Sequence, residues 1–124
     1  NGFISISHSD SLAAIVWHPT KEYAIDIEEF SGRIQRISKR AFSETELDFA
    51  GNDELKLNIL WNTKECVYKL ANIQGLDFKA QIKVEPFVEN SQIKASLISA
   101  ENTKEFIFNS GTILNHSFVW GCEV

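Results

Sequence analysis

The first third of the chain places its apolar side chains in short runs that predict strands. Phe3–Ser7 alternates between apolar and polar residues, which favours a strand with one covered face. Leu12–Trp17 is a continuous apolar run between polar turn residues, so we expect a buried strand there. Ser9-Asp10-Ser11 would join these two strands in a hairpin, and Tyr23–Glu28 predicts a third strand.

The middle of the chain changes to a helical spacing of apolar residues. Arg33–Ala41 predicts a short amphipathic helix. Ser43 and Glu46 have the spacing of a capping box, in which each side chain binds a free backbone N–H of the other residue, and they predict the start of a second short helix. Glu54–Asn72 is the longest helical segment, with an apolar stripe that we expect to be buried: Leu55, Ile59, Leu60, Val67 and Leu70.

Strand-forming residues return after Phe78 and continue to the end of the chain. Turn-forming residues such as Ser110-Gly111 separate these runs, so antiparallel hairpins are the natural arrangement. The expected strands are Ala80–Val88, Gln92–Ser99, Glu105–Asn109 and Ile113–Trp120. The whole pattern predicts an α+β fold, in which an antiparallel sheet packs against one long and two short helices in one domain over residues 1–124.

The composition is that of a globular chain, since 44% of the 124 residues are hydrophobic and 23% are charged. The formal net charge of −5 argues against nucleic acid as the main partner. No apolar run approaches the roughly 20 residues that span a membrane, so we expect no membrane partner. Cys66 and Cys122 make neither a disulfide framework nor a zinc motif, and we expect reduced thiols in a cytoplasmic protein.

Three carboxylates are the main candidates for chemistry. Asp26 and Glu28 lie two residues apart on a strand, so both leave the same face, and Glu65 lies on the long helix. Carboxylates held close together favour a divalent cation between them, because the bare charges repel. Each also has a plainer explanation, since Asp26 and Glu28 suit a solvent-facing strand end and Glu65 suits a surface salt bridge with Lys69.

These residues fall within segments that together resemble the 4′-phosphopantetheinyl transferase superfamily. The combination of W-x-x-K-E-x-x-x-K with an earlier D-x-E is specific, and matching order and spacing extend from Ile4 to about Phe78. The last third of the chain carries no motif of the family. The matching segments are ISISHS (Ile4–Ser9), IDIE (Ile25–Glu28), RAFSETE (Arg40–Glu46), WNTKECVYKL (Trp61–Leu70) and GLDF (Gly75–Phe78).

The resemblance implies a Mg²⁺-dependent transfer of the phosphopantetheine arm of coenzyme A to a serine of an acyl or peptidyl carrier protein, with release of 3′,5′-ADP. The carrier would serve fatty acid, polyketide or nonribosomal peptide synthesis. Asp26, Glu28 and Glu65 would bind the metal, and Glu65, preferably through a water, would take the serine proton. The coenzyme phosphates would contact Ser7, His8, Ser9, Lys64 and Lys69, and the two lysines would also assist the transfer.

Arg33, Arg36 and Arg40 form one stripe of the first short helix. The resemblance places this helix near the docking site of the carrier, and carriers of this kind are acidic. We therefore expect the stripe to attract the carrier, while a solvated basic face is an equally good explanation.

The order of the motifs resembles the second lobe of the longer, two-lobed class of the family, because Ser7-His8-Ser9 precedes Asp26 and Glu28. The resemblance then implies either that a first lobe is missing from these 124 residues or that the chain associates with itself. The alternative function is that of a non-catalytic relative, which binds a carrier protein or a nucleotide without transfer.

Overall fold

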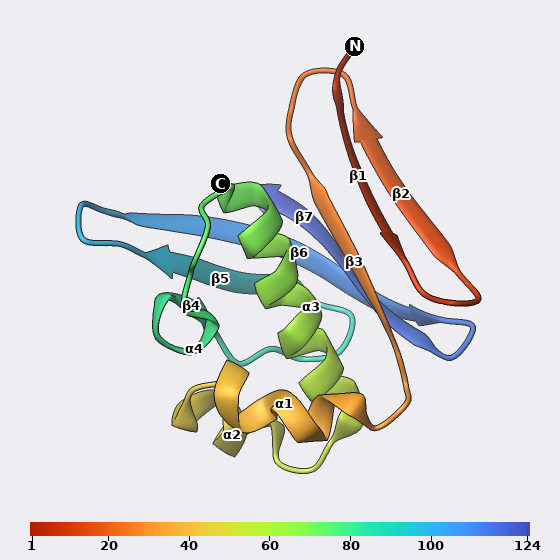
Figure 1. The fold of residues 1–124 in the computed structure, drawn as a ribbon, viewed down its shortest axis with the longest axis vertical. Coiled ribbons are helices and arrows are strands. Elements are labelled where there is room, and N and C mark those ends of the chain that lie inside the picture. The colour runs from red at the N-terminus through yellow and green to blue at the C-terminus, as the bar shows by residue number, and fades with distance from the viewer.

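A curled five-stranded antiparallel sheet and one long helix form the centre of the molecule (Figure 1). The structure is a computed structural model that describes residues 1–124. The sheet order is β3-β7-β6-β5-β4, and the long helix α3, Glu54–Ala71, lies across one face of it. This architecture confirms the predicted α+β class. The strands of the sheet are β3 (Ala24–Glu29), β4 (Ile82–Val84), β5 (Ile93–Ile98), β6 (Thr103–Ile113) and β7 (His116–Glu123).

The hydrophobic core lies between α3 and the sheet. Ile59, Leu60 and Val67 of the predicted apolar stripe are buried, whereas Leu55 and Leu70 are only partly covered. Burial of a side chain of this size contributes roughly 1.5–3 kcal/mol, so these contacts fix the helix on the sheet. The sheet strands β6 and β7 contribute the buried residues Phe106, Phe108 and Val119 to the same core.

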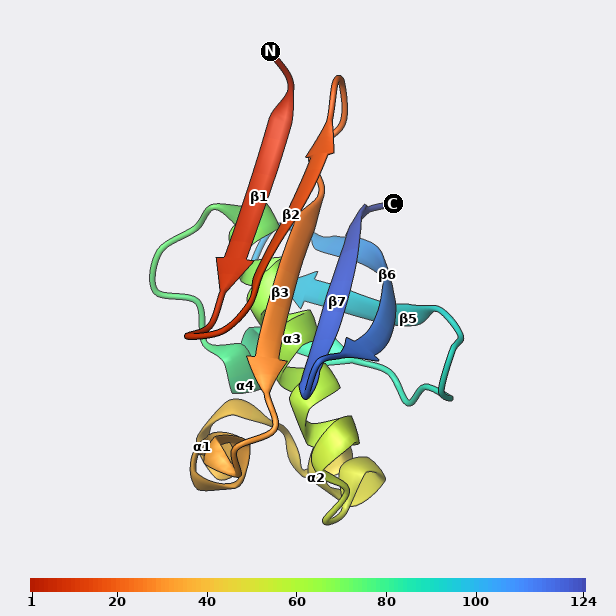
Figure 2. The ribbon, with the colours of Figure 1, turned by 90° about the vertical axis from the view of Figure 1, so that its right-hand side faces the viewer.

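The strands β1 (Phe3–His8) and β2 (Ala13–His18) form a separate antiparallel hairpin, as predicted. The hairpin runs beside the edge strand β3 without backbone pairing (Figure 2). Serine hydroxyls take the place of backbone carbonyls, because Ser5 Oγ accepts the N–H of Ile25 (3.2 Å) and Ser7 Oγ accepts the N–H of Ile27 (3.1 Å). Residues two apart on a strand share a face, so both hydroxyls reach β3 together.

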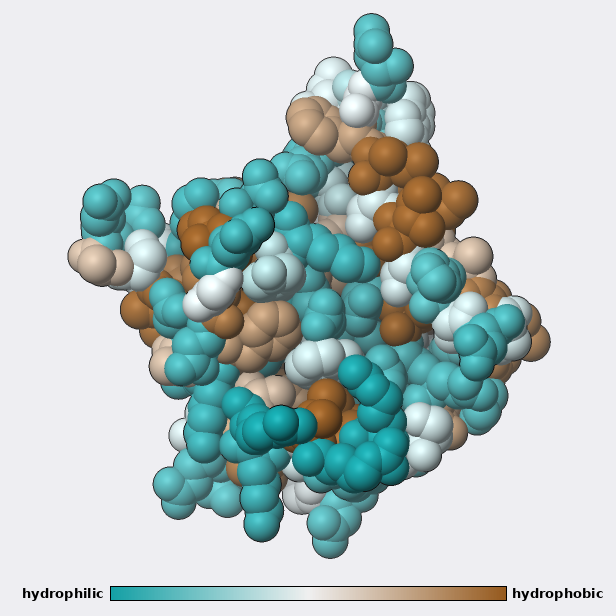
Figure 3. All heavy atoms as spheres, in the orientation of Figure 1, coloured by the Kyte–Doolittle hydropathy of each residue, from teal (hydrophilic) through white to brown (hydrophobic).

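The outer face of the hairpin is apolar and open to solvent. Ile4 lies opposite Trp17 and Ile6 lies opposite Ile15, and each of the four is between 53% and 62% exposed. The predicted burial of Leu12–Trp17 is therefore wrong, because only the serine-bearing face of the hairpin has a neighbour. Figure 3 shows hydrophobic residues gathered on this part of the surface.

The short helices α1 (Arg33–Ala41) and α2 (Glu44–Ala50) lie against α3. The capping box of α2 is present, since Ser43 Oγ accepts the N–H of Glu46 and Glu46 Oε1 accepts the N–H of Ser43. None of the helices combines the length and the apolar character needed to cross a bilayer. Both cysteines are unpaired.

Several predicted boundaries in the last third are wrong, and β4 ends at Val84 instead of Val88. Phe78–Gln81 forms the one-turn helix α4 in place of the start of a strand, because the Asp77 side chain caps its first N–H groups. β6 continues through Ser110-Gly111, and the turn into β7 is Leu114-Asn115, whose φ angles are 47° and 63°. The longer hairpin places His116 and Ser117 opposite the end of β3.

Candidate functional site

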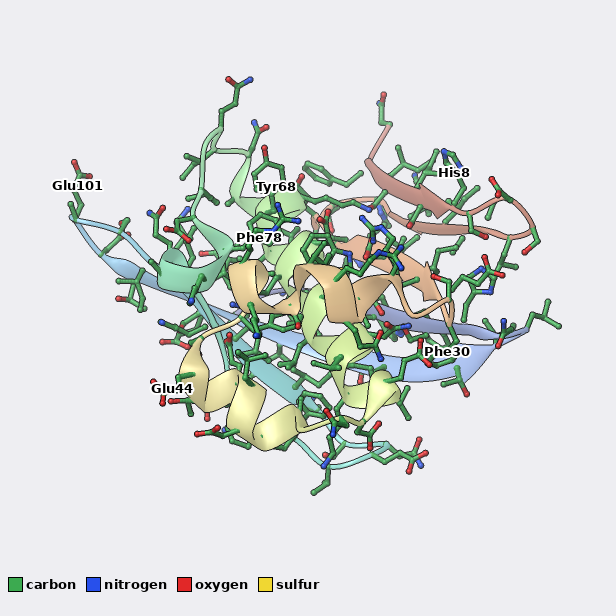
Figure 4. All side chains as sticks on the ribbon, turned by 60° about the horizontal axis from the view of Figure 1, so that its bottom comes forward. His8, Phe30, Glu44, Tyr68, Phe78 and Glu101 are labelled. Carbon is green, nitrogen blue, oxygen red and sulfur yellow. The ribbon has the colours of Figure 1, made fainter.

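One polar cavity of about 420 Å³ lies where the tip of the β1–β2 hairpin, the end of β3 and the middle of α3 meet. Segments that are far apart in the sequence contribute to it. In Figure 4, His8 is labelled on the hairpin, and Phe30 marks the chain just after β3. The predicted site residues that line this cavity are Ser7, His8, Ser9, Asp26, Glu28, Arg33 and Glu65.

The lining of the cavity is strongly acidic. Its carboxylates are Asp10, Asp26, Glu28, Glu29 and Glu65, and its guanidinium is that of Arg33. Such an excess of negative charge favours a cation and repels an anion that arrives without one.

Asp26 is the most enclosed carboxylate of the cavity, with only 8% of its surface exposed. Its Oδ2 accepts from Asn62 Nδ2 at 2.8 Å, and its Oδ1 lies 3.3 Å from Ser7 Oγ and 3.5 Å from Lys69 Nζ. Burial raises the pKa of Asp26 above its ordinary value, while the bonds from Asn62, Lys69 and Ser7 act in the opposite direction. The carboxylate is thus held in one orientation by three donors on two elements, β1 and α3.

Glu65 projects into the cavity from α3. Burial, together with the negative charges of Asp26 and Glu28, raises its pKa from 4.5 to about 7, although Lys69 and Arg33 oppose the shift. A carboxyl with this pKa exchanges protons near neutral pH. The negative charges of Asp26 and Glu28 thus act on Glu65 across the cavity.

Glu28 is occupied by Arg33, whose Nη1 lies 3.0 Å from Glu28 Oε2. The same guanidinium lies 5.7 Å from the ring centroid of Trp61, within the range of a cation–π contact. Arg33 therefore lines the cavity wall, although it is itself exposed, as are Arg36 and Arg40 on the same helix. The attraction of a carrier by these three arginines stays a prediction.

The structure does not bring Lys64 to the cavity. Its ammonium group is fully buried and binds Glu46 Oε1 (2.8 Å) and the carbonyl oxygens of Ala41 (2.9 Å) and Phe78 (2.7 Å). Burial lowers the pKa of Lys64, and Glu46 partly restores it. The predicted phosphate-binding role of this lysine conflicts with these contacts, which make Lys64 a structural link between α3, α1 and α2.

Lys69 contacts a residue of the site, Asp26, without lining the cavity itself. Its Nζ binds the carbonyl oxygen of Ile25 at 2.7 Å and lies 3.5 Å from both Ile6 O and Asp26 Oδ1. Lys69 does not line the cavity. The expected contact with a substrate phosphate is therefore not prepared in this arrangement, in which the lysine joins β1 to β3 and partly neutralises Asp26.

Three polar residues that the sequence did not indicate hold the lining residues of the cavity in place: Asn62, His116 and Ser117. Ser117 Oγ donates to Asn62 Oδ1 at 2.6 Å, and Asn62 in turn holds Asp26. Ser9 Oγ lies 2.7 Å from His116 Nε2. Asn62 falls inside the W-N-T-K-E segment, but His116 and Ser117 are more than fifty residues further on, and no local spacing could have linked them to the cavity.

The carboxylates are the oxygen ligands that Mg²⁺ prefers, but their positions in this structure do not form a complete metal site. Nowhere in the chain do three His, Cys, Asp or Glu side chains lie close enough together to hold a metal ion, so the expected ligand set of Asp26, Glu28 and Glu65 is not assembled. Glu28 is turned towards Arg33, whereas Asp26 and Glu65 both face the cavity. Two hard oxygen ligands are enough for Mg²⁺ when water and phosphate oxygens complete its shell.

A shallower, more apolar groove of about 320 Å³ adjoins the polar cavity. The two share Arg33 and Trp61, and the groove adds the apolar side chains of Ile37, Ala41 and Phe78 and the basic Arg40. An elongated ligand with one charged end and one less polar end would match the polar cavity and the adjoining apolar groove.

A scan against protein-family models gives no match, and a search of the curated proteins finds no match to this chain.

Proposed function

We propose that the chain is a lobe of the 4′-phosphopantetheinyl transferase type, which transfers the phosphopantetheine arm of coenzyme A to a serine of an acyl or peptidyl carrier protein. One observation carries the proposal: the separate segments His8–Ser9, Asp26–Glu28 and Glu65 line one cavity. These are the segments on which the resemblance rests, and a fortuitous match would give no reason for them to meet.

The acidic cavity explains why the reaction would need a divalent cation. A diphosphate alone would be repelled by the carboxylates that surround Arg33. Asp26 and Glu65 would hold Mg²⁺ from two different elements, with Glu28 free to join when Arg33 turns to the substrate. When bound, the ion neutralises charge on the diphosphate and on the departing 3′,5′-ADP.

Glu65 is suited to direct the proton of the carrier serine to a neighbouring water, because a carboxylate that also binds Mg²⁺ is a poor base by itself. The serine oxygen forms a bond to the phosphorus that carries the pantetheine arm, and the bond from that phosphorus to 3′,5′-ADP breaks. The serine proton passes to a water beside Glu65. His8 lies at the hairpin tip, where it can bind phosphate oxygens, whereas the Ser9 hydroxyl is bound to His116 and supports the turn.

The apolar groove gives the less polar pantetheine arm a path out of the cavity between Ile37 and Phe78. This path ends beside the exposed Arg40, with Arg36 one helical turn before it on α1. Their charge would attract an acidic carrier to the end of the arm where transfer takes place.

The decisive experiment is the transfer itself. The chain is mixed with coenzyme A, Mg²⁺ and an apo carrier protein, and a carrier mass increase equal to one phosphopantetheine group is expected. Glu65→Gln should reduce turnover far more than coenzyme binding, while Glu101→Gln, at the far tip of the β5–β6 turn (Figure 4), should change neither. The proposal fails if the wild-type chain transfers no arm and binds no coenzyme A.

A binding protein without transferase activity is the second candidate, and one observation favours it. Neither Lys64 nor Lys69 lines the cavity, so the cationic groups expected to assist the transfer are turned away from it. Coenzyme A binding without a mass change of the carrier would identify this function.

A further inference from the structure

The start of β7 places two polar side chains beneath the cavity. His116 and Ser117 directly follow the Leu114-Asn115 turn and are 1% and 0% exposed. They pair with Glu29 and Glu28 of β3, so they lie at the strand end that bears the carboxylates. Neither residue belongs to the segments that carry the resemblance.

The contacts of His116 fix its tautomer and its role. Nδ1 lies 2.7 Å from the carbonyl oxygen of Leu114, which can only accept, so Nδ1 carries the proton. Nε2 then has a free lone pair and accepts the hydroxyl of Ser9 at 2.7 Å. Ser9 Oγ also accepts the N–H groups of Ser11 (3.3 Å) and Leu12 (3.2 Å), so His116 holds the turn that presents His8 and Ser9 to the cavity.

The contacts of Ser117 act on the carboxylate of β3. Ser117 Oγ donates to Asn62 Oδ1 at 2.6 Å, which leaves the Asn62 amide nitrogen to donate to Asp26 Oδ2 at 2.8 Å. The Asp26 carboxylate can only accept, so the amide nitrogen of Asn62 faces it and Asn62 Oδ1 faces Ser117. The Ser117 hydroxyl satisfies that buried oxygen and so holds the Asn62 side chain in the position from which it binds Asp26.

We infer that His116 and Ser117 are positioning residues for the cavity: His116 places the His8–Ser9 turn through Ser9, and Ser117 places the Asp26 carboxylate through Asn62. The inference deepens the proposed function and rests on it for the identity of the ligands. It assigns the last hairpin, which carries no motif, the task of aligning the two halves of the site. Groups of this kind around metal ligands affect metal affinity by roughly 10–100-fold.

Nuclear magnetic resonance of the metal-free protein tests the inference without any ligand. Ser117→Ala should shift the carboxyl carbon signal of Asp26 and the side-chain amide signals of Asn62. Thr112→Ala is the matched control, because Thr112 is exposed and pairs directly with Ser117 in the same hairpin. An Asp26 carboxyl signal that stays in place in Ser117→Ala would overturn this half of the inference.

His116 offers two isosteric replacements with opposite outcomes. The asparagine of His116→Asn reaches only the Nδ1 position and keeps the bond to Leu114, whereas the glutamine of His116→Gln reaches the Nε2 position and keeps the bond to Ser9. The backbone amide signals of His8 and Ser9 should move in the first variant and stay in the second. Should His116→Asn not fold, His116→Gln decides alone, and displaced amide signals in that variant would refute the role of His116.

Binding measurements then separate this inference from the proposed function. With Mn²⁺ as the probe, Ser117→Ala should raise the Kd for the metal about tenfold, and Thr112→Ala should not. His116→Asn should raise the Kd for coenzyme A about tenfold at saturating Mn²⁺, and His116→Gln should restore it. Absence of Mn²⁺ and coenzyme binding by the wild-type chain would refute the proposed function, and the resonance experiments would still decide the positioning roles.

Discussion

The buried ammonium of Lys64 can be tested directly, because the sequence suggests that it binds substrate whereas its contacts in the structure are all with the protein interior. Lys64→Met keeps the length and the apolar stem of the side chain but removes the charge. The structure predicts a large loss of stability, because three acceptors lose their donor at once: Glu46 Oε1, Ala41 O and Phe78 O.

The size of the stability loss follows from the Glu46 carboxylate that is left without its partner. Glu46 is 3% exposed and would keep its negative charge in the interior, with only the N–H groups of Ser43 and Val84, each at 2.8 Å, to bind it. Removing one partner of a buried ion pair costs about 3–5 kcal/mol. Domains of this size are stabilised by about 5–15 kcal/mol, so Lys64→Met would lose a large part of the total.

Urea unfolding followed by tryptophan fluorescence measures this loss. The control is Lys94→Met, at an exposed position of β5, and its free energy of unfolding should change by less than about 0.5 kcal/mol. The double variant Lys64→Met/Glu46→Gln should recover part of the loss, because the stranded charge is removed. If Lys64→Met were as stable as wild type and yet lost transfer activity, Lys64 would act on substrate and the structural assignment would be refuted.

Further predictions concern the site, the carrier surface and the sheet. The folded state holds the Glu65 proton with a pKa of about 7 against 4.5, so as pH rises through this window the free energy of unfolding should fall by up to roughly 3 kcal/mol, and Glu65→Gln should flatten that part of a urea-unfolding pH series. Arg36→Glu should lower kcat/KM for the carrier several-fold at low salt and reduce its salt dependence, with the KM for coenzyme A unchanged; identical carrier kinetics would exclude a steering role. Gly121→Ala should destabilise the fold by at least about 1–3 kcal/mol in thermal unfolding, because the new methyl would overlap the carbonyl oxygen of Ile107, and Gly111→Ala should cost less, since only a phenylalanine ring must move there. A smaller loss at Gly121 than at Gly111 would contradict the packing argument.

Local features of the fold were predictable because their causes are local. The capping box of α2 and the span of α3 follow from residues three to four apart that act on one helix. The β1–β2 hairpin follows in the same way from two short apolar runs and a polar turn. The burial of β2 was predicted wrongly, because an apolar run shows that a segment can be buried and not that a neighbour exists to bury it.

The candidate site was predictable only in part, for a related reason. Asp26, Glu28 and Glu65 line one cavity, but the three do not assemble into the metal-ligand set that the sequence suggested. The directions of the cationic side chains were not predictable, because Lys64 and Lys69 are adjacent to the site in sequence but find their acceptors on other elements. The roles of His116 and Ser117 on β7 could not be predicted from the sequence, because the register of β7 against β3 sets their position.

The sequence by itself determined the class of elements, their order and the set of acidic groups available for chemistry, since propensity, capping and side-chain alternation act over a few residues. Only the tertiary structure decided which of those groups face a common space. Burial, charge pairing and strand register act between segments tens of residues apart. Through these effects Lys64 is buried in the core, Arg33 pairs with Glu28, and Ser117 binds the asparagine that holds Asp26.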